Sequence, residues 1–357
     1  MIKHPLSKLA PIKLGALLFA TAALFTSSCE RKSTASWDTP GEAAPAATAA
    51  PVSTPAPEKK PAPAPTPVAA PAPQKEVSPE ASAPGSLRFI GYNVENWLTM
   101  DRYENGKSSK NANKPEDQKA AVIAILSRMK PDVLGLCEIG QKEDILDLQT
   151  RLKAAGLDLP NLHYAGGVDP TRHLALLSRF PISKTGTIAK SDYTLEGQTL
   201  SIQRGVLDAT VTANGSDYRF LGVHLKSKRE VENGDQAAMR LNEAHLLRDH
   251  IDSILAADPA TKLVAYGDFN DTRASPAIKL IQGTYNHPNY LTPLPLKDRN
   301  GEYWTHFWER EDVYSRFDWI LVSQPLKSEV NFEASRIIDE PEWDKASDHR
   351  AVMMLLK

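Results

Sequence analysis

From residue 87 onward, short apolar runs alternate with longer segments in which apolar residues recur every three or four positions. The apolar runs predict seven strands, at residues 87–92, 133–137, 174–177, 218–223, 263–266, 317–322 and 351–356. The longer segments predict helices, of which one begins at Pro115, one ends at Gly156 and one carries Leu247, Ile251 and Ile254 on one face. Because strands and helices alternate without an internal repeat, we expect a single α/β domain over residues 87–357.

The first 29 residues have a different pattern, which is typical of a signal peptide. Three lysines precede an uncharged apolar run over residues 14–25, and small residues then lead to Cys29. As a helix this run would span roughly 18 Å, less than the ~30 Å hydrocarbon core, so a transmembrane helix is disfavoured. The residues before Cys29 resemble a bacterial lipobox, although Thr26 stands where leucine is usual.

The lipobox resemblance implies that residues 1–29 form a lipoprotein signal peptide and that Cys29 is lipidated. The protein would then be exported and anchored to a membrane, on the periplasmic side or at the cell surface. Ordinary secretion and a retained anchor are the alternatives.

Residues 30–86 are rich in proline and alanine. Of the 27 prolines in the chain, 13 lie between Arg31 and Ser86, together with 15 alanines and a single aromatic residue, Trp37. Such a segment cannot bury a core and favours the polyproline II conformation, which at ~3.1 Å per residue could reach up to ~170 Å. We therefore expect a tether between the anchor and the folded domain. A ligand for a proline-binding module is the alternative.

Charge and cysteine content narrow the classes of function. The chain has 42 basic and 44 acidic residues, and residues 87–357 alone carry 34 and 38, so bulk positive charge cannot hold nucleic acid. Two cysteines, Cys29 and Cys137, exclude a disulfide-dense scaffold and a four-cysteine zinc site. We therefore expect the substrate to bind at a local site rather than through the overall charge of the protein.

Polar residues repeatedly follow or end the predicted strands, and such positions meet at one sheet edge in α/β enzymes. They are Asn93, Glu95, Glu138, His224, Asp268, Asn270, Asp348 and His349. A set of candidate ligands that is rich in oxygen donors and contains no cysteine favours Mg²⁺ or Mn²⁺ over zinc. Glu138 ends an apolar run, where a buried charge is costly unless it meets a cation, so we expect it to bind the metal. A solvated strand end is the alternative.

Two further pairs indicate hydrolytic chemistry. Asp268 and Asn270 lie two residues apart on an expected turn, where both could face a nucleophilic water and a phosphate oxygen. His349 stands beside a carboxylate, and Asp318 on a neighbouring strand could orient its imidazole for acid or base catalysis.

In order along the chain, these segments resemble the endonuclease/exonuclease/phosphatase superfamily, with the deoxyribonuclease I-like fold. The segments are Asn93-Val94-Glu95-Asn96, Glu138, His224-Leu225-Lys226-Ser227-Lys228, Gly267-Asp268-Phe269-Asn270, Asp318 and Ser347-Asp348-His349. The resemblance covers nearly all of residues 87–357. It implies a four-layer α/β sandwich of two packed mixed sheets flanked by helices, and Mg²⁺-dependent hydrolysis of phosphate esters, with Mn²⁺ as a possible substitute.

The resemblance also implies a role for each residue that carries it. Glu138 and Asn93 would hold the metal, Asp348 would approach it, and Asp268 would position or deprotonate the attacking water. The phosphoryl group would be bound by Asn270 and His224, and the site completed by His349, oriented by Asp318. Whether Asp268 or His349 acts as acid or base stays open, and Glu95 contacts a metal or only fixes its loop.

The substrate is less closely defined by the sequence. The motif from His224 to Ser227 resembles secreted nucleases, sphingomyelinases and inositol phosphatases rather than abasic-site repair enzymes. No tyrosine lies in residues 169–179, where some members of the family contact phosphate. Arg172 or His173 could substitute there. The other candidate phosphate contacts are Arg204 and Arg240, as surface arginines, and Lys226.

Two basic loops, with Lys107, Lys110 and Lys114 in one and Lys226, Lys228 and Arg229 in the other, favour a nuclease that grips flanking phosphates. We therefore expect a monomeric catalytic domain with nucleic acid as its substrate. A phosphatase or phosphodiesterase acting on an inositol phosphate or a sphingomyelin-like lipid, and a catalytically silent surface binding module, are the alternatives.

Overall fold

The computed structural model describes residues 85–104, 106–231 and 234–357. The expected signal peptide, the lipidated Cys29 and the tether lie outside the described residues. Among the described residues, no helix is both long and apolar enough to cross a membrane.

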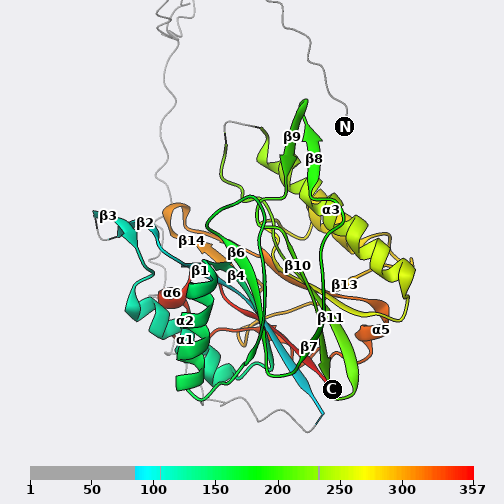
Figure 1. Ribbon diagram of the computed structural model, residues 1–357, viewed down its shortest axis with the longest axis horizontal. Helices are drawn as coiled ribbons and strands as arrows, with labels where there is room; N and C mark the ends of the chain where they lie inside the picture. Colours follow the sequence, from blue (N-terminus) through cyan, green and yellow to red (C-terminus); the bar gives the residue numbers. More distant parts are fainter. Residues whose placement is uncertain (1–84, 105, 232–233) are drawn as a thin grey trace, which may run out of the picture. The chain divides into compact units, whose positions relative to one another are not determined.

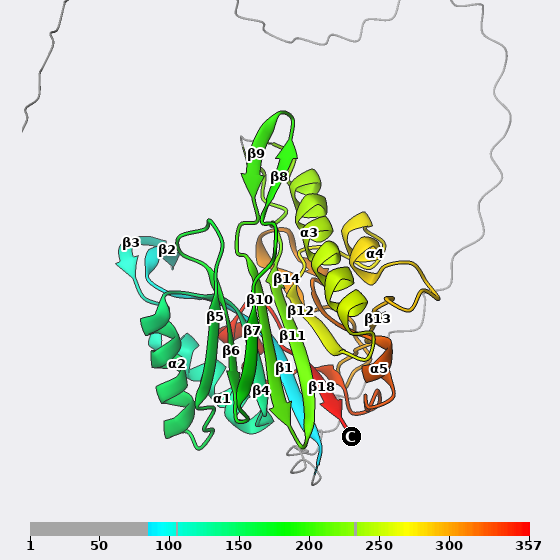
Figure 2. The same cartoon turned by 45° about the vertical axis from the view of Figure 1, so that its right-hand side comes forward.

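Two six-stranded sheets pack face to face (Figures 1 and 2). The first sheet has the order β17 (Arg336–Ile337), β18 (Val352–Leu356), β1 (Leu87–Trp97), β4 (Val133–Ile139), β6 (His173–Ser178) and β5 (Asn161–Ala165). The second has the order β13 (Thr292–Pro293), β16 (Asp318–Val322), β12 (Lys262–Asp268), β11 (Ser216–His224), β10 (Val206–Ala213) and β7 (Ile182–Gly186). Both sheets are mixed, since β1 is parallel to β4 and β11 is parallel to β12 while their other neighbours are antiparallel.

Helices cover the outer face of each sheet. The first sheet is covered by α1 (Glu116–Met129), α2 (Lys142–Ala154) and α6 (Trp343–Ala346), and the second by α3 (Gln236–Ala257) and α4 (Pro276–Gln282). The short helices α5 (Gln324–Lys327) and η1 (Glu309–Glu311) lie in connections. One apolar cluster lies between the sheets and one beneath each helical layer. The expected four-layer α/β sandwich is therefore confirmed.

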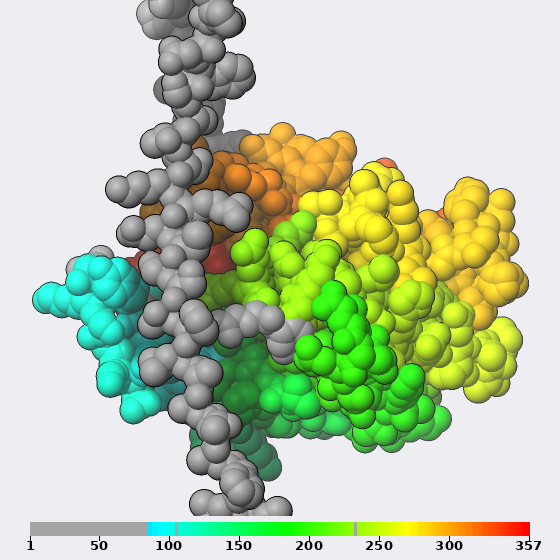
Figure 3. All heavy atoms as spheres, turned by 90° about the horizontal axis from the view of Figure 1, so that it is seen from above, coloured from blue at the N-terminus to red at the C-terminus, as the bar shows by residue number. Residues whose placement is uncertain are grey.

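Three two-stranded hairpins lie around one end of the sandwich. They are β2 (Met100–Glu104) with β3 (Lys107–Ala112), β8 (Asp192–Leu195) with β9 (Gln198–Ser201), and β14 (His306–Trp308) with β15 (Val313–Ser315). Figure 3 looks down on this end, with the first hairpin in cyan, the second in green and the third in orange.

All seven predicted strands are present, with shifted ends, but five strands of the two sheets, β5, β7, β10, β13 and β17, and the six hairpin strands were not predicted. The strand β10 lies inside the second sheet, and its Asp208 is buried. The Asp208 carboxylate accepts hydrogen bonds from Arg219 at 2.8 and 2.6 Å and lies 2.9 Å from His250 Nε2. A buried, paired carboxylate thus interrupts the apolar pattern by which a central strand is recognised.

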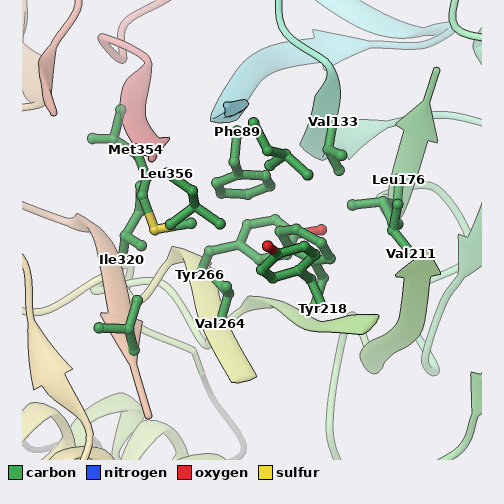
Figure 4. Packing of buried hydrophobic residues seen from close by; sticks show 14 of the residues in the cluster. Phe89, Val133, Leu176, Val211, Tyr218, Val264, Tyr266, Ile320, Met354 and Leu356 are labelled. Atoms are coloured by element: carbon green, nitrogen blue, oxygen red, sulfur yellow. The ribbon is translucent and has the colours of Figure 1, made fainter. Parts of the chain in front are cut away.

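Tyr266 of β12 fills the centre of the interface between the sheets (Figure 4). Its ring packs edge-on against Phe89 of the first sheet, with the centroids 4.7 Å apart. The ring has room because Gly135 and Gly222 have no side chains. A Cβ atom at Gly135 would lie 2.1 Å from Tyr266 Cε2, and one at Gly222 would lie 2.6 Å from the hydroxyl oxygen. A single aromatic side chain therefore occupies slots in both sheets.

We expect Gly135→Ala to lower the free energy of unfolding by about 2 kcal/mol, because the added methyl group overpacks the slot that holds the tyrosine ring. Urea unfolding of the full chain measures this loss. In a Tyr266→Leu background the same substitution should cost less, since the ring is gone. An equal loss in both backgrounds would contradict this account.

Candidate active site

Strand register brings the polar strand ends together at the end of the sandwich that carries the hairpins. In the second sheet His224, Asp268 and Asp318 lie in one row across β11, β12 and β16. In the first sheet Asn93 pairs with Cys137, directly before Glu138. The two rows meet, because the amide nitrogen of Asn93 donates to Asp268 Oδ2 at 3.1 Å across the two sheets. The expected convergence is therefore observed.

The Asp268 carboxylate is the centre of this arrangement. Its Oδ2 lies 3.2 Å from Asn270 Nδ2, 3.5 Å from His224 Nε2 and 3.7 Å from His349 Nε2, while Oδ1 accepts from the Asn270 backbone N–H at 2.8 Å. Burial raises the pKa of Asp268 to about 7, with Asp318 and Glu138 acting in the same direction and His349 against it. The ionised carboxylate therefore needs positive charge close by.

Glu138 reaches the site through an irregularity in β4. The register between β4 and β6 shifts between Cys137 and Ile139, and Glu138 has a φ of 59°. A bulge of this kind turns a side chain out of the regular alternation. The Glu138 carboxylate accepts from Asn93 Nδ2 at 3.3 Å and from the Asn96 backbone N–H at 3.1 Å. Its side chain thus faces the site rather than bulk solvent.

His349 is held by Asp318 as the sequence predicts. Nδ1 of the imidazole lies 2.7 Å from Asp318 Oδ2, so Nε2 faces Asp268. Burial alone would lower the pKa of His349, but the carboxylates of Asp318, Asp268 and Asp348 outweigh it and hold the pKa well above its ordinary value. The ring is therefore an imidazolium at neutral pH.

His224 has the opposite charge state. Burial, with Arg204 and His349 acting in the same direction, holds its pKa well below the ordinary value. Its Nε2 lies 3.8 Å from Glu138 Oε1, and its buried Nδ1 makes no hydrogen bond with the residues that the structure describes. One neutral and one charged imidazole therefore flank the same carboxylate, an arrangement typical of acid–base sites.

Residues 104–349 match the Endonuclease/Exonuclease/phosphatase family. The chain belongs to this family. It is therefore a metal-dependent phosphoric ester hydrolase. No curated protein matches the chain.

Solved structures of several proteins share the fold. An endonuclease/exonuclease/phosphatase family protein from Leptotrichia buccalis is 17% identical, with 76% of this chain and 99% of that chain covered and a TM-score of 0.52. The human nocturnin catalytic domain, with bound sulfate, is 17% identical, with 78% and 96% covered and a TM-score of 0.54. Beta toxin 275-280 from Staphylococcus aureus is 15% identical, with 76% and 100% covered and a TM-score of 0.54. At these identities the likeness establishes the fold alone.

The donor set in this member of the family fits a hard divalent cation. Carboxylate oxygens are available from Glu138 and Asp268, and the Asn93 amide N–H groups face both carboxylates, as positive charge would. Asn93 would offer its Oδ1 to a metal only with the amide turned over, because that oxygen accepts from the Glu95 backbone N–H at 3.0 Å. Among the described residues, ligand atoms of three His, Cys, Asp or Glu residues come within 4.8 Å of one another in two groups, and each group includes His349. We favour the oxygen set, because a protonated imidazole is not a metal ligand. Asp348, next to His349, extends that set toward solvent.

The candidate phosphate contacts differ in their environments. Arg172 is partly exposed, and its Nε donates to Asn96 Oδ1 at 2.8 Å and lies 3.9 Å from Glu138. Arg204 is mostly buried, with Nε 3.4 Å from Asp169 Oδ2, and neither its Nε nor its Nη1 makes a hydrogen bond within the described part of the chain. These two nitrogens are buried, but the guanidinium is close enough to the site to lower the pKa of His224.

Two expectations about cations need correction. Arg240 is buried rather than a surface arginine, and it donates to Asp271 Oδ2 and to the Lys226 carbonyl, each at 3.0 Å. Lys114 is also buried, and its Nζ donates to the Glu95 carbonyl at 3.0 Å instead of facing a flanking phosphate. Both side chains support loops of the site from beneath.

Lys226 is buried as well, and its side chain folds back onto its own loop. Its Nζ contacts the Ser227 carbonyl at 3.4 Å and the Arg229 carbonyl at 3.3 Å. His173 is turned away from the centre, with Nδ1 3.1 Å from the Gly140 carbonyl.

Sequence reasoning missed Glu243 of α3, which is buried beneath the site. Its two carboxylate oxygens accept from the backbone N–H groups of Gln203 at 3.0 Å and Lys226 at 2.6 Å. These bonds fix the segment that carries Arg204 and the loop that follows His224. The signal in the sequence was a charged residue four positions before Leu247, within the apolar stripe of a predicted helix.

No motif in the sequence singles out His306, yet it lies against the centre of the site. Its ring centroid is 4.7 Å from that of His349, and it stacks on Phe317 at 5.0 Å. Nothing next to His306 in the sequence indicates this position, because β14 is only three residues long.

We expect His349→Ala to lower turnover by ~10²–10⁴-fold with the fold intact, because it removes the charged donor beside Asp268. Asp318→Asn should lose less. Since the two residues form one unit, the double variant should be hardly worse than His349→Ala alone, as steady-state kinetics will measure. Additive losses would instead mean independent roles.

Glu243→Gln should lower kcat/KM by about 10-fold, because one of two backbone N–H groups loses its acceptor and the attached loop shifts. Asp249→Asn, at an exposed position of the same helix, is the matched control. Unchanged kinetics in Glu243→Gln, with a loss of stability only, would restrict Glu243 to a structural role.

Proposed function

We propose that this protein is a Mg²⁺-dependent nuclease that hydrolyses nucleic-acid phosphodiesters outside the cytoplasm. The observation that carries the proposal is a pair of arginines, Arg172 and Arg204, that both contact Asp169 beside the site. Arg204 is close enough to His224 to lower the pKa of that imidazole, and Arg172 lies 3.9 Å from Glu138. Together with the exposed lysines of the β2–β3 hairpin, they provide positive charge for a backbone of phosphates although the domain as a whole is acidic.

In the proposed reaction a water molecule attacks phosphorus and the bond from phosphorus to the leaving oxygen breaks. Asp268 takes a proton from the water, and Nε2 of His349 gives its proton to the leaving oxygen, while Asp318 keeps the imidazole oriented. Neutral His224 and Asn270 contact the phosphoryl oxygens. A bound Mg²⁺, held by Glu138 and Asn93 with Asp348 nearby, would stabilise the negative charge that develops on the phosphoryl group.

We also propose that the catalytic domain over residues 87–357 is held at a membrane by lipid on Cys29, through the tether at residues 30–86. The lipobox-like sequence and the composition of the tether support this location. A tethered, exported enzyme would encounter nucleic acid outside the cell rather than the chromosome.

A substrate panel tests the function. The purified protein with Mg²⁺ is given single- and double-stranded DNA, RNA, inositol phosphates and sphingomyelin, with the His349→Ala variant as a blank for contaminating nucleases. We expect cleavage of nucleic acid by the wild type only. Exclusive release of phosphate from inositol phosphates, or of phosphocholine from sphingomyelin, would reject the nuclease.

Glu138→Gln should raise the Mg²⁺ concentration needed for half-maximal activity and lower turnover, because it removes a carboxylate charge from the proposed metal site. EDTA should abolish activity of the wild type. Glu143→Gln, at an exposed position of α2, is the matched control. Unimpaired hydrolysis by Glu138→Gln at limiting Mg²⁺ would remove Glu138 from the metal site.

Cys29→Ser should release the protein from membranes in cell fractionation without changing the activity of the purified protein, because the thiol that carries the lipid is gone. Cys137→Ser should leave the distribution unchanged, since Cys137 is buried in β4. Equal membrane fractions of wild type and Cys29→Ser would reject lipidation at this position.

A further inference from the structure

The hairpin of β14 and β15, residues 306–315, forms a fixed wall of the active site. His306 and His349 form an isolated antiparallel bridge, and the Phe307 N–H donates to the Asp348 carbonyl at 3.0 Å. Backbone contacts therefore join the hairpin to the segment that carries His349. We call residues 306–315 the aromatic hairpin.

The two faces of the aromatic hairpin have different surroundings. Phe307 and Tyr314 are paired and stack at 4.4 Å, and Tyr314 also packs against Trp304 at 4.7 Å. His306 points to the opposite face, toward His349 and Phe317. Because side chains alternate along a strand, Trp308 lies on the same face as His306.

Trp308 extends the wall of the active site with an open aromatic surface. It is 50% exposed, and its cross-strand partner Val313 is 43% exposed. Two residues along a strand place Trp308 roughly 7 Å beyond His306. This distance is comparable to the reach of one sugar between a phosphate and its base. The catalytic centre therefore continues into an apolar surface that can receive a flat group.

Charge around the aromatic hairpin limits what this surface can hold. At its inner end the half-exposed Lys228 lies with Nζ 5.4 Å from the centroid of the Phe317 ring and 3.2 Å from Asp271 Oδ1. At its outer end the turn carries three acidic residues, Glu309, Glu311 and Asp312, against one basic residue, Arg310, so its net charge is negative. Positive charge at the inner end suits a phosphate, and negative charge at the outer end repels a second phosphate or an anionic membrane. An uncharged ring between the two ends fits both conditions.

We propose that Trp308 is a specificity-determining residue, on which the base of a single nucleotide stacks while its phosphate lies at the catalytic centre. This inference rests on the proposed function and names the part of the substrate that the site selects. Stacking on an aromatic face accepts every base, because each base has a π-face. The site would therefore prefer nucleotides over base-free phosphoesters without reading sequence.

The kinetic test uses two esters with the same leaving group and charge, thymidine 5′-(p-nitrophenyl phosphate) and methyl p-nitrophenyl phosphate. In Trp308→Ala the ratio of kcat/KM for the nucleoside ester to that for the methyl ester should fall roughly 5- to 150-fold, mainly through KM, as expected for the loss of one stacked base. Trp308→Phe should retain most of the ratio. An equal loss on both esters would overturn the proposal and leave Trp308 a structural role.

The control variant is Phe332→Ala, which removes a partly exposed aromatic ring near the end of β18 opposite to His349 and should keep the ratio. A binding measurement separates failure of this inference from failure of the proposed function. Thymidine 5′-monophosphate in EDTA should quench the tryptophan fluorescence of the wild type and do so less in Trp308→Phe. Equal quenching would overturn the inference even if the enzyme cleaves DNA. Reduced quenching would support base binding even if the enzyme cleaves no nucleic acid.

Discussion

The burial of negative charge at one end of the sandwich is the constraint on which the rest of the site depends. Asp268 and Asp318 are almost completely buried in one row of the second sheet, and Glu138 faces them from the first. Like charges in such surroundings require compensation. In this protein the imidazolium of His349 and the amide of Asn93 compensate the negative charge. The metal ion on which the family depends would add further positive charge. Each of these partners comes from a different strand or loop, so the charge requirement holds the two sheets in one arrangement.

The same constraint explains the irregular backbone of the site. Glu138 and Asn270 both have left-handed φ angles, of 59° and 50°, at the ends of otherwise regular strands. Regular continuation of β4 would turn the Glu138 side chain to the other face of its sheet. The strained residues thus lie where function requires a departure from the alternating pattern. Glu243 and Arg240 bind backbone atoms of Gln203 and Lys226 and hold the loop that follows His224 in place.

Most of the fold and the centre of the site could be predicted because both depend on local pattern. Apolar runs that end in Asp, Glu, Asn or His predict where strands stop and what they carry, and the register of the sheets then aligns Asp268 with His224 and Asp318. The strand β10 was missed because its buried Asp208 is satisfied by partners that are distant in sequence.

Ion pairs and other tertiary contacts explain the remaining differences between the predicted and the observed positions of residues. Arg240 and Lys114 were expected at the surface, since a charged residue is usually solvated, but Asp271 and Glu95 allow their burial. Glu243 and His306 went unrecognised because their importance arises from tertiary contacts with loops that their own sequence neighbourhood does not specify.

Tyr266 links the packing between the two sheets to the geometry of the active site. It lies two residues before Asp268 on the same face of β12, and its ring is lodged against Gly135 of the other sheet. With that ring in its slot, the sheets cannot slide past one another. The proposed metal ligands belong to one sheet and the aspartate proposed to act on the water to the other, so a slip of about 1 Å would misalign the reacting groups. The alignment of the candidate active site therefore depends on a buried tyrosine that lies outside it.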